Sequence, residues 1–499
     1  MTEVPTDAAA LADALARFPS FRVLVVGDVM LDSVVRGEVR RVSPEAPAPV
    51  LLAGEERHDL GGAANVAHQL AALGATVELF GVVGADPEAA QIRDRCDSLG
   101  ITATLLQDAT VPTTRKIRYL AGPHHLLRVD REAVVRDTSM LEVALRDRFA
   151  NGPRPDVVVL SDYGKGVVDP AVSTLVTGSA SRCGVPVLLD PKTDDLVRCR
   201  GASVIKANGA EFEALTGRAI DHADVARGVE AERDRISEAS GCDRFVITLG
   251  ERGMVVVDGR RPARWLPAVA GPVTDVSGAG DVVIATLSLC LTAGLDLEVA
   301  AWVASVAAGL SVSQSGVAVV PLAELASALG GHLPGGVLPR AEVVGRARLW
   351  SIAGRRVVFT NGCFDLLHPG HVHLLRAAAS LGDVLVVAVD TDESVSELKG
   401  AARPVTPLPA RTAVLAALEC VDAVVPFHHR ELEALVAEVA PSCLVKGGDY
   451  QLDEVVGREV VESAGGTVEL IPLLGGASTS EVIGRIAGRL PEPATPPVD

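Results

Sequence analysis

The chain has 499 residues, of which 48% are hydrophobic, 22% are charged and 3% are aromatic, and its formal charge is −18. A chain of this length predicts more than one domain, because single hydrophobic cores stop growing near about 250–300 residues. The negative charge and the scarcity of aromatic rings disfavour nucleic acids and anionic membranes as partners, since binding them needs a basic footprint or rings that stack on bases. A small phosphorylated ligand is not excluded, because a few local groups can hold it.

The cysteines and the N-terminus indicate a cytoplasmic protein. The eight cysteines contain no C-x-x-C pair, so neither a zinc site nor a disulfide scaffold is expected. Met1–Ala10 lacks the basic start of a signal peptide. The most apolar stretch, Val282–Val312, is interrupted by two acidic residues, and no uninterrupted apolar run reaches the about 20 residues that span a bilayer. We therefore expect no membrane partner.

Short β-branched runs alternate with alanine-rich stretches of helix length along almost the whole chain. This alternation predicts an α/β fold with parallel sheets covered by helices on both faces. Gly330–Pro339, rich in glycine and proline, separates two such patterns. We therefore expect a first domain at 1–330, a linker at 331–345, a second domain at 346–490 and a disordered tail at 491–499. The clearest expected strands are Arg22–Val26, Asp156–Leu160, Val185–Leu189, Arg244–Thr248, Val357–Thr360 and Val384–Val389.

Polar residues and glycines follow the first expected strand. Gly27-Asp28 and Asp32 come just after it, and open α/β sheets bind ligands at the carboxyl ends of their strands. Leu60–Asn65 (LGGAAN) then places two glycines before a helix of small residues, which suits close approach by a polyhydroxylated ligand. These segments predict a ligand site beside the first strand.

A second polar turn, Asn208–Glu211 (NGAE), follows the expected strand Ala202–Ile205. Its amide and carboxylate could lie near a metal-bound phosphate. The chain contains no G-x-x-x-x-G-K-[ST] phosphate-binding loop. Phosphate would therefore have to be bound by another turn.

The segment Val276–Asp281 (VSGAGD) provides such a turn, and the helix-length apolar run Val282–Leu295 follows it. Gly278 and Gly280 would let backbone N–H groups converge at the positive end of the helix dipole and form an anion hole. A carboxylate at its edge can accept a proton from a hydroxyl that attacks a phosphoryl group. The alternative is that Asp281 only caps the helix.

The order of these motifs resembles that of the ribokinase-like sugar kinases, and the resemblance extends from about Phe21 to Leu325. GDVMLD, VSPEAPAPV, GGAANV and SDYGKG look most like the heptose-7-phosphate kinases of that family. The resemblance implies that Asp281 is the catalytic base for the anomeric hydroxyl. Ser277 stands where the family usually has threonine, and Ala207 where it usually has proline, but neither change removes a functional group.

The same resemblance assigns three further groups of residues. The anion hole for the γ-phosphoryl group would consist of Gly278, Ala279 and Gly280. The sugar would be bound by Asp28, Asp32, Gly61, Gly62 and Asn65. Mg–ATP would be bound by Asn208, Gly209, Ala210, Glu211, Thr248, Gly250 and Ser277, with Glu211 holding Mg²⁺ through phosphate or water.

In the second half, the expected strand Arg356–Thr360 leads through Asn361–Asp365 (NGCFD) to His368-Pro-Gly-His371, which opens the expected helix Val372–Ser380. Two imidazoles at i and i+3 of a helix N-terminus can both donate to one anion. They could stabilise charge on an α-phosphate while pyrophosphate is displaced. A metal site is disfavoured because no third ligand with suitable spacing follows. A solvated helix start is the other alternative.

This turn resembles the H-x-G-H motif of the cytidylyltransferase-like nucleotidyltransferases, and the match extends over about Arg355–Arg489. It implies a Rossmann-like domain in which His368 and His371 are catalytic. Lysines and arginines would neutralise the triphosphate. The implied nucleotide-binding residues are Thr360, Gly362, Phe364, Asp365, Lys399, Arg411, Lys446, Ser478, Thr479 and Ser480.

Together the two halves resemble the family of bifunctional heptose-7-phosphate kinases and heptose-1-phosphate adenylyltransferases. The resemblance implies ATP-dependent phosphorylation of D-glycero-D-manno-heptose 7-phosphate to the 1,7-bisphosphate, and AMP transfer to heptose 1-phosphate to give ADP-heptose and pyrophosphate. It further implies Mg²⁺, a homodimer and a separate phosphatase between the two steps. The alternatives are another sugar phosphate, CTP in the second half, a catalytically dead sensor domain, or a scaffold that only assembles partners.

Overall fold

The computed structural model describes residues 7–488 except 123, 193, 222–223, 270, 272, 315, 333–335, 449–450 and 473–487. The described residues form two compact units, one at 14–325 and the other at 326–488 together with 7–13. Two helices, α1 (Ala8–Arg17) and α11 (Leu322–His332), include the boundaries between them. The expected tail at 491–499 lies outside the described residues.

The core of the first unit is a nine-stranded sheet. All neighbouring strands are parallel except β11–β12 and β12–β13, which form an antiparallel edge. In spatial order the strands are β13 (Arg264–Leu266), β12 (Met254–Asp258), β11 (Arg244–Thr248), β10 (Val204–Asn208), β9 (Val187–Asp190), β8 (Val157–Ser161), β1 (Arg22–Gly27), β4 (Thr76–Val83) and β5 (Thr102–Gln107).

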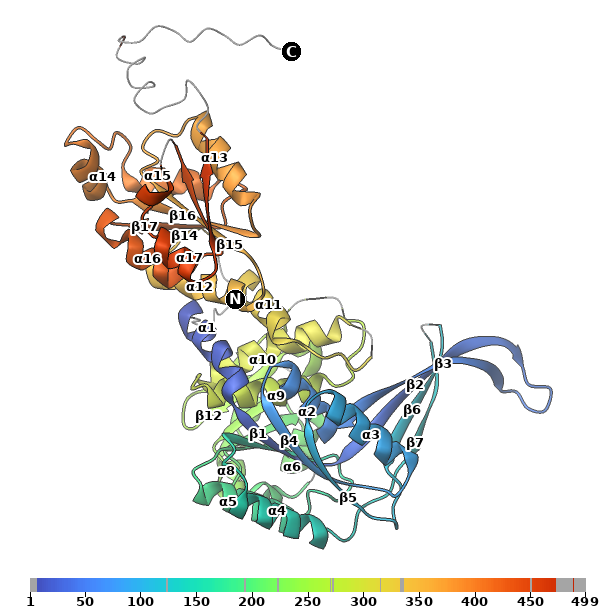
Figure 1. Ribbon diagram of the computed structural model, residues 1–499. Coiled ribbons are helices and arrows are strands. Elements are labelled where there is room, and N and C mark those ends of the chain that lie inside the picture. The colour runs from blue at the N-terminus through green and yellow to red at the C-terminus, as the bar shows by residue number, and fades with distance from the viewer. Residues whose placement is uncertain are drawn as a thin grey trace. The chain divides into compact units, whose positions relative to one another are not determined.

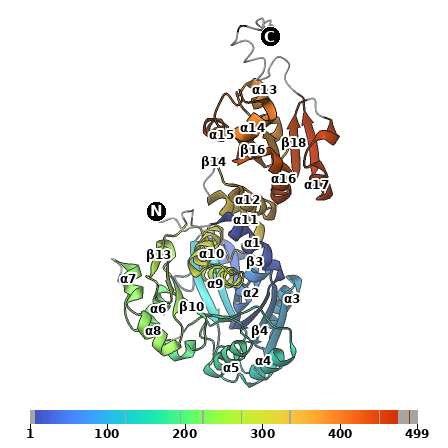
Figure 2. The ribbon, with the colours of Figure 1, turned by 90° about the vertical axis from the view of Figure 1, so that its left-hand side faces the viewer.

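Helices cover both faces of this sheet, which confirms the expected α/β fold. One face carries α2, α9 and α10, and the other carries α4 and α5 (Figures 1 and 2). The helices of this unit are α2 (Ala63–Ala72), α3 (Pro87–Ser98), α4 (Ser139–Asn151), α5 (Pro170–Arg182), α6 (Gly209–Thr216), α7 (Val225–Glu230), α8 (Arg233–Ser240), α9 (Ala279–Thr292) and α10 (Leu297–Val312).

A second sheet, of four strands, was not expected from the sequence. Its order is β3 (Pro49–Gly62), β2 (Val29–Val42), β6 (Thr114–Ala121) and β7 (His124–Arg131), and only the β2–β6 pair is parallel. The halves of β2 and β3 far from the core are exposed, so they lack the continuous apolar runs by which buried strands are recognised. Figure 1 shows β2 and β3 projecting beyond the rest of their unit.

The second unit is built on a six-stranded sheet that is parallel throughout. One apolar cluster joins α12, α16 and α17 to one face, and another joins α13 and α15 to the opposite face. The strands in spatial order are β14 (Gly336–Val337), β17 (Ala423–Phe427), β16 (Val384–Asp390), β15 (Val357–Gly362), β18 (Cys443–Gly447) and β19 (Thr467–Ile471). The helices are α12 (Arg340–Ile352), α13 (Pro369–Ala379), α14 (Asp392–Lys399), α15 (Leu408–Ala416), α16 (Leu432–Val439) and α17 (Arg458–Ser463).

The segment expected as a linker, 331–345, contributes to this second unit. Its residues Gly336–Val337 pair with β17, and α12 begins at Arg340 directly after Pro339. Gly345 of α12 packs so closely on the N-terminal helix that an added Cβ would lie 2.3 Å from the backbone N of Ala9. Part of the segment expected as a linker is therefore regular secondary structure, namely β14 and the start of α12.

None of the helices in the described part of the chain combines the length and the apolar character needed to cross a membrane.

Candidate active sites

The first candidate site lies at the carboxyl ends of the central strands of the first unit. It consists of two neighbouring cavities of about 220 and 600 Å³, and Lys206, Asn208 and Gly280 line both of them. The smaller cavity is bounded by the four-stranded sheet, the loop after β8 and the start of α9. The larger cavity is lined by many apolar side chains, and Thr248 and Gly250 also line it.

Asp281 lies on the first turn of α9 and is only 5% exposed. Its Oδ2 accepts a hydrogen bond of 2.6 Å from Nδ2 of Asn65, and its Oδ1 accepts one from the hydroxyl of Tyr163. Burial raises the pKa of Asp281, whereas these two hydrogen bonds lower it. The described hydrogen bonds of this carboxylate thus go to other elements of the fold, and they orient it toward the cavity instead of capping α9.

Neighbouring side chains approach closely at the two glycines before Asp281. Gly278 has φ +80°, and an added Cβ would lie 2.9 Å from Nδ2 of Asn65. At Gly280 an added Cβ would lie 2.9 Å from Nζ of Lys206. The positive end of the α9 dipole therefore lies beside the ammonium group of Lys206. Together they form a site for an anion.

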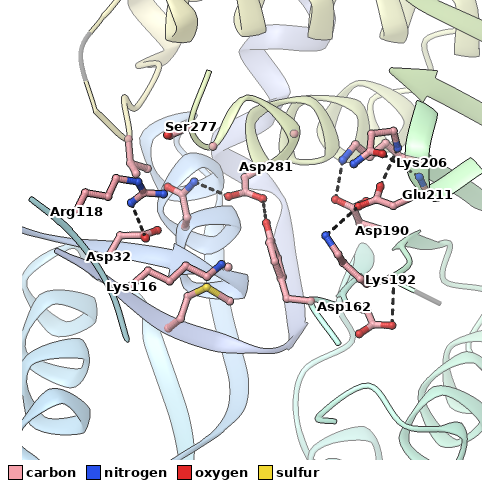
Figure 3. A pocket seen from close by; sticks show the side chains of 18 residues that line it. Asp32, Lys116, Arg118, Asp162, Asp190, Lys192, Lys206, Glu211, Ser277 and Asp281 are labelled. Carbon is pink, nitrogen blue, oxygen red and sulfur yellow. Dashed lines mark hydrogen bonds and ion pairs between the residues drawn. The ribbon is translucent and has the colours of Figure 1, made fainter. Parts of the chain in front are cut away.

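Lys206 is buried and forms an ion pair of 2.7 Å with Asp190. Burial alone would lower the pKa of Lys206, but Asp190 outweighs it and raises that pKa, so the lysine stays cationic. In Figure 3, Asp281 lies between this pair on one side and the Asp32–Arg118 pair on the other. The site thus holds its carboxylate between two cationic groups.

The Asn208–Glu211 motif forms a capping box at the start of α6. The backbone N–H of Glu211 donates to the Asn208 side chain over 2.9 Å, and the backbone N–H of Asn208 donates to the Glu211 carboxylate over 2.8 Å. Both side chains also line the smaller cavity, whereas Gly209 and Ala210 are not among the described residues that line either cavity.

Three carboxylates, Asp162, Asp190 and Glu211, gather on this side of the smaller cavity. Mg²⁺ is held by one or two carboxylates together with substrate phosphates, so this set fits the cation. Nζ of Lys192 lies 3.7 Å from Oε1 of Glu211. An acidic wall beside cationic groups is the arrangement that a metal-bound phosphate needs.

On the opposite side, Asp32, Gly62 and Asn65 line the smaller cavity together with two basic residues of β6. Arg118 donates to Asp32 over 2.9 Å, and the ammonium group of Lys116 lies 5.5 Å from the ring centroid of Tyr163. Burial lowers the pKa of Lys116. This side therefore offers groups for both hydroxyls and an anion.

Two residues expected at the sugar have other tasks. Asp28 is 1% exposed, and its carboxylate accepts the backbone N–H groups of Tyr163, Lys165 and Val167 over 2.7 to 3.0 Å. It therefore fixes the loop that carries Tyr163 and is not among the described cavity residues. Gly61 lies behind Asp32, since an added Cβ would be 2.5 Å from Oδ2 of that carboxylate. Ser277 lines the smaller cavity, as expected for its position before the anion hole.

The second candidate site is a cavity of about 570 Å³ at the carboxyl ends of β15, β16 and β18. His368 precedes the first residue of α13, and His371 lies on its first turn. Their rings are stacked with centroids 3.8 Å apart, and Phe364 lies 5.2 Å from His371. Burial, followed by the neighbouring His368, lowers the pKa of His371 to about 4. His371 is therefore neutral near pH 7 and carries a single N–H, and its ring also has a hydrogen bond to the backbone of Leu366.

Two lysines and a buried carboxylate complete this cavity. Lys399 lines it, and so does Lys446, whose Nζ lies 3.2 Å from Oδ1 of Asn361. Asp365 accepts the backbone N–H groups of Val405 and Thr406 over 2.7 and 2.9 Å. Asp365 therefore holds the loop after α14 in place while it lines the cavity together with Gly362.

Arg411 and Thr360 are not among the described residues that line this cavity. Arg411 is 1% exposed and donates to the carbonyl oxygens of Cys363 and Thr406 over 2.5 and 2.9 Å, and to Asp392 over 2.6 Å. It therefore braces the loop that leads to His368, and it cannot reach a triphosphate without breaking these bonds. Thr360 is fully buried within β15. Ser478, Thr479 and Ser480 lie outside the described residues.

Sequence reasoning missed several residues of both cavities. The alternating basic residues of Thr114–Ala121 (TRKIRYLA) were a signal, because a strand places Lys116 and Arg118 on one face. Asp162 and Tyr163 lie in the segment SDYGKG and Cys363 lies in NGCFD, but neither pattern gives these residues a role. Other polar residues of the cavities have no local pattern that points to the site, namely Asp190, Lys192 and Lys206 in the first unit, and Asp390 and His429 in the second.

Comparison with known proteins agrees with this division. Residues 20–323 match the model of the pfkB family of carbohydrate kinases, and residues 359–484 match the cytidylyltransferase-like model. "Bifunctional protein HldE" of Halorhodospira halophila is 43% identical over 486 residues, which cover 95% of this chain and 99% of the relative. The protein of the same name from Caulobacter vibrioides is 44% identical over 485 residues, with 95% and 99% covered. The chain belongs to the HldE family of bifunctional proteins. As a member of that family it is an enzyme with carbohydrate kinase and nucleotidyltransferase activities, and such families use ATP and typically a divalent metal.

Solved structures share the fold of the first unit of this HldE-family chain. Phosphofructokinase-2 from Escherichia coli in complex with substrates and products has a TM-score of 0.52 at 16% identity, covering 62% of this chain and 97% of that one. Ribokinase from Arabidopsis thaliana complexed with ribose and ATP has a TM-score of 0.50 at 19% identity, covering 62% and 98%. These likenesses establish the ribokinase-like fold that the motifs predicted.

Proposed function

We propose that this HldE-family chain phosphorylates D-glycero-D-manno-heptose 7-phosphate at its anomeric hydroxyl and then, after loss of the 7-phosphate, transfers AMP from ATP to heptose 1-phosphate. The observation that carries the first half is Asp281, held by Asn65 and Tyr163 beside a glycine turn at the positive end of α9. The motif resemblance and the full-length similarity to HldE proteins support the choice of a heptose.

In the kinase step, Asp281 accepts the proton of the anomeric hydroxyl as its oxygen attacks the γ-phosphorus. The bond from that phosphorus to the bridging oxygen of ADP breaks, and ADP leaves. The backbone N–H group of Gly280 and the ammonium group of Lys206 stabilise the charge on the phosphoryl oxygens, whereas the N–H of Ala279 donates to the carbonyl oxygen of Val276 over 3.3 Å. Glu211, with Asp162 and Asp190 nearby, would hold Mg²⁺, which neutralises phosphate charge when bound.

Lys116 and Arg118 support a sugar that already carries a phosphate. Both line the smaller cavity on the side away from Lys206 and the acidic wall. An unphosphorylated sugar would leave Lys116, whose pKa is lowered by burial, without an anionic ligand. A distal phosphate bound there would direct the anomeric end toward Asp281.

In the transfer step, an oxygen of heptose 1-phosphate attacks the α-phosphorus of ATP and pyrophosphate leaves. His368 and His371 donate to the α-phosphate oxygens, while Lys399 and Lys446 neutralise the rest of the triphosphate. The rings need no covalent bond to the substrate, because the sugar phosphate is itself the nucleophile. The products are ADP-heptose and pyrophosphate.

Three further points belong to this proposal. A separate phosphatase removes the 7-phosphate, because neither mechanism hydrolyses a phosphate ester. The chain forms a homodimer, which is supported by exposed apolar side chains on the four-stranded sheet, namely Val39, Val42, Leu52, Leu127 and Val129. The location is cytoplasmic, because both steps consume ATP and all eight cysteines are free thiols.

The test is a coupled assay of the purified chain with heptose 7-phosphate, Mg–ATP and an added phosphatase, with products identified by mass spectrometry. We expect the 1,7-bisphosphate without phosphatase and ADP-heptose with it. A parallel reaction supplies CTP as the only nucleotide in the second step. A faster reaction with CTP, or phosphorylation of another sugar phosphate in preference to the heptose, would refute the corresponding half of the proposal.

A further inference from the structure

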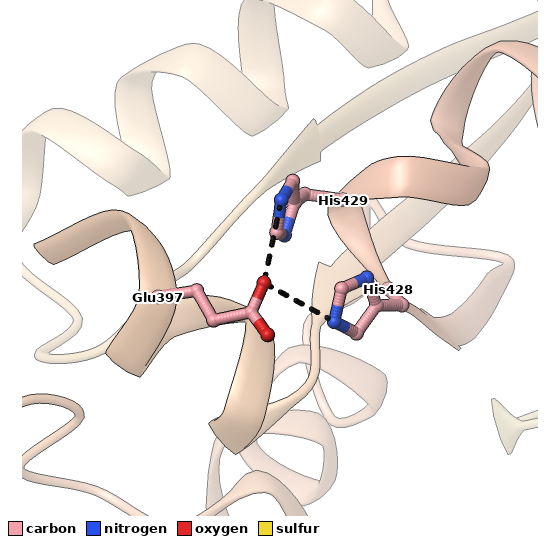
Figure 4. A group of neighbouring side chains, drawn as sticks. All are labelled: Glu397, His428 and His429. Atoms are coloured by element: carbon pink, nitrogen blue, oxygen red, sulfur yellow. Dashed lines mark ion pairs between the residues drawn. The ribbon is translucent and has the colours of Figure 1, made fainter.

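A group of three metal-ligating side chains lies in the second unit, apart from the H-x-G-H histidines. It consists of Glu397 near the end of α14 and of His428 and His429, which follow β17 (Figure 4). One ligand atom from each lies within 4.8 Å of the others. All three side chains are between 26% and 44% exposed, so an ion from solution can reach them.

The distances are close to those of a tetrahedral metal site. Nε2 of His428 and Nε2 of His429 each lie 3.7 Å from Oε2 of Glu397. Zn²⁺ binds nitrogen and oxygen at about 2.0–2.1 Å, which for tetrahedral geometry separates two ligand atoms by about 3.3–3.5 Å. The two glutamate–histidine pairs would reach that separation by a contraction of a few tenths of an ångström, and the ligand atoms of the two histidines lie within 4.8 Å of each other.

The tautomer of His429 is fixed by Ser394. The hydroxyl of Ser394 donates its single hydrogen to Oδ1 of Asp390 over 2.8 Å. Its oxygen therefore accepts from Nδ1 of His429, at 3.0 Å, and also from the backbone N–H of the same residue, at 3.0 Å. Neutral His429 then carries its proton on Nδ1, so the lone pair of Nε2 faces the carboxylate of Glu397. Two electron-pair donors that face each other at 3.7 Å are the arrangement that a cation stabilises.

Two local contacts compete with a metal ion. Arg430 donates to Oε2 of Glu397 over 2.8 Å, and its own side chain is 71% exposed. Nδ1 of His428 accepts the backbone N–H of Arg430 over a long distance of 3.4 Å. Metal binding at Nε2 would break this contact, because the proton of the neutral ring would then be on Nδ1. Removal of the Arg430 guanidinium should therefore strengthen metal binding, which a merely structural ion-pair cluster would not show.

We propose that Glu397, His428 and His429 bind one divalent transition-metal ion of the Zn²⁺ class. Two imidazoles and one carboxylate suit zinc and its neighbours, whereas Mg²⁺ prefers oxygen ligands and retains its waters. The fourth position stays open to water or to a ligand oxygen. Because His429 also lines the cavity of the second unit, the ion would lie beside the site of nucleotide transfer.

The experiment uses the full-length protein after treatment with a chelator. Zn²⁺ alone is titrated in buffer without nucleotide or Mg²⁺, with binding followed by calorimetry and by competition with a chromophoric chelator. We expect one equivalent bound to the wild type, loss of that equivalent in Glu397→Gln and in His428→Ala/His429→Ala, and tighter binding in Arg430→Gln. Ser394→Ala should weaken binding about 10–100-fold, since it removes the group that orients His429. His125→Ala, an exposed histidine on β7, serves as the matched control.

The variants separate a metal site from a folding effect. Arg430→Gln requires a gain of affinity, which a damaged protein does not produce, and circular dichroism checks the others for native secondary structure. Absence of a bound equivalent in the wild type would overturn the proposal. An equivalent that persists in His428→Ala/His429→Ala, or an affinity that Arg430→Gln leaves unchanged or lowers, would overturn it as well.

Discussion

Asn65 donates a hydrogen bond of 2.6 Å from Nδ2 to Oδ2 of Asp281, although 216 residues separate the two in the chain. Tyr163 donates to the other carboxylate oxygen from a third segment. The geometry of the proposed base is thus determined by tertiary structure, and each donor can be tested separately.

Tyr163→Phe removes the hydrogen bond to Oδ1 of Asp281. Because that bond stabilises the ionised carboxylate and lowers its pKa, its loss should raise the pKa of Asp281 further. The acid limb of the kinase kcat/KM profile should therefore move to higher pH. At pH values on the acidic side of that limb, kcat/KM should fall about tenfold. Tyr119→Phe on β6 is the control. A lower rate with an unmoved acid limb would show that Tyr163 acts on something other than the proton of Asp281.

Lys116→Ala tests the site of the distal phosphate. We expect the KM for the sugar phosphate to rise about tenfold or more, because a hydrogen bond between charged groups is lost, while the KM for ATP stays unchanged. Arg41→Ala, on the exposed half of β2, should leave both constants unchanged. Equal effects on the two substrates would instead indicate a general distortion of the cavity.

His371 should titrate differently with and without nucleotide. In the free enzyme its pKa is about 4, so carbon-13 NMR of the labelled imidazole should show a neutral ring near pH 7. A bound triphosphate should raise that pKa, since it stabilises the imidazolium. The low pKa also predicts lower stability in acid. The unfolded state binds a proton at His371 near pH 6.5, whereas the folded state binds it only near pH 4, so the free energy of unfolding decreases as the pH falls from about 6.5 to about 4. His371→Gln should reduce this dependence. A free-enzyme pKa near the ordinary value would contradict the burial argument.

Arg411→Ala should act through stability. The side chain is buried and makes three hydrogen bonds, so its removal should cost about 3 kcal/mol in the second unit and reduce nucleotidyl transfer, while the kinase rate stays unchanged. Urea unfolding followed with a probe in the second unit measures the change. Arg376→Ala, exposed on α13, should change stability by no more than about 0.5 kcal/mol. A higher KM for ATP without loss of stability would favour a direct contact with phosphate.

The sequence was informative where a motif and its regular element lie together. The α/β class and the ribokinase-like fold of the first unit could be predicted, because buried parallel strands form continuous apolar runs and the GAGD turn directly precedes its helix. The positions of Gly278, Asp281, His368 and His371 at helix starts followed from the same local patterns.

Residues whose role depends on distant partners could not be assigned from the chain. Asp28 and Arg411 look like ligand-binding residues, but each uses its hydrogen bonds to hold a backbone loop. Tyr163 and Lys206 reach the site because β8 and β10 end beside α9, which no spacing in the sequence encodes. The four-stranded sheet was missed because its strands are half exposed.

The most direct test of two independent sites in one chain is to measure both half-reactions in Asp281→Asn and in His371→Ala. Asp281→Asn should lower the kinase rate by about 10²–10⁴-fold, the usual contribution of a general base, and leave AMP transfer to heptose 1-phosphate unchanged. His371→Ala should lower AMP transfer and leave the kinase rate unchanged. Loss of both activities in either variant, or of neither activity in both variants, would contradict the account.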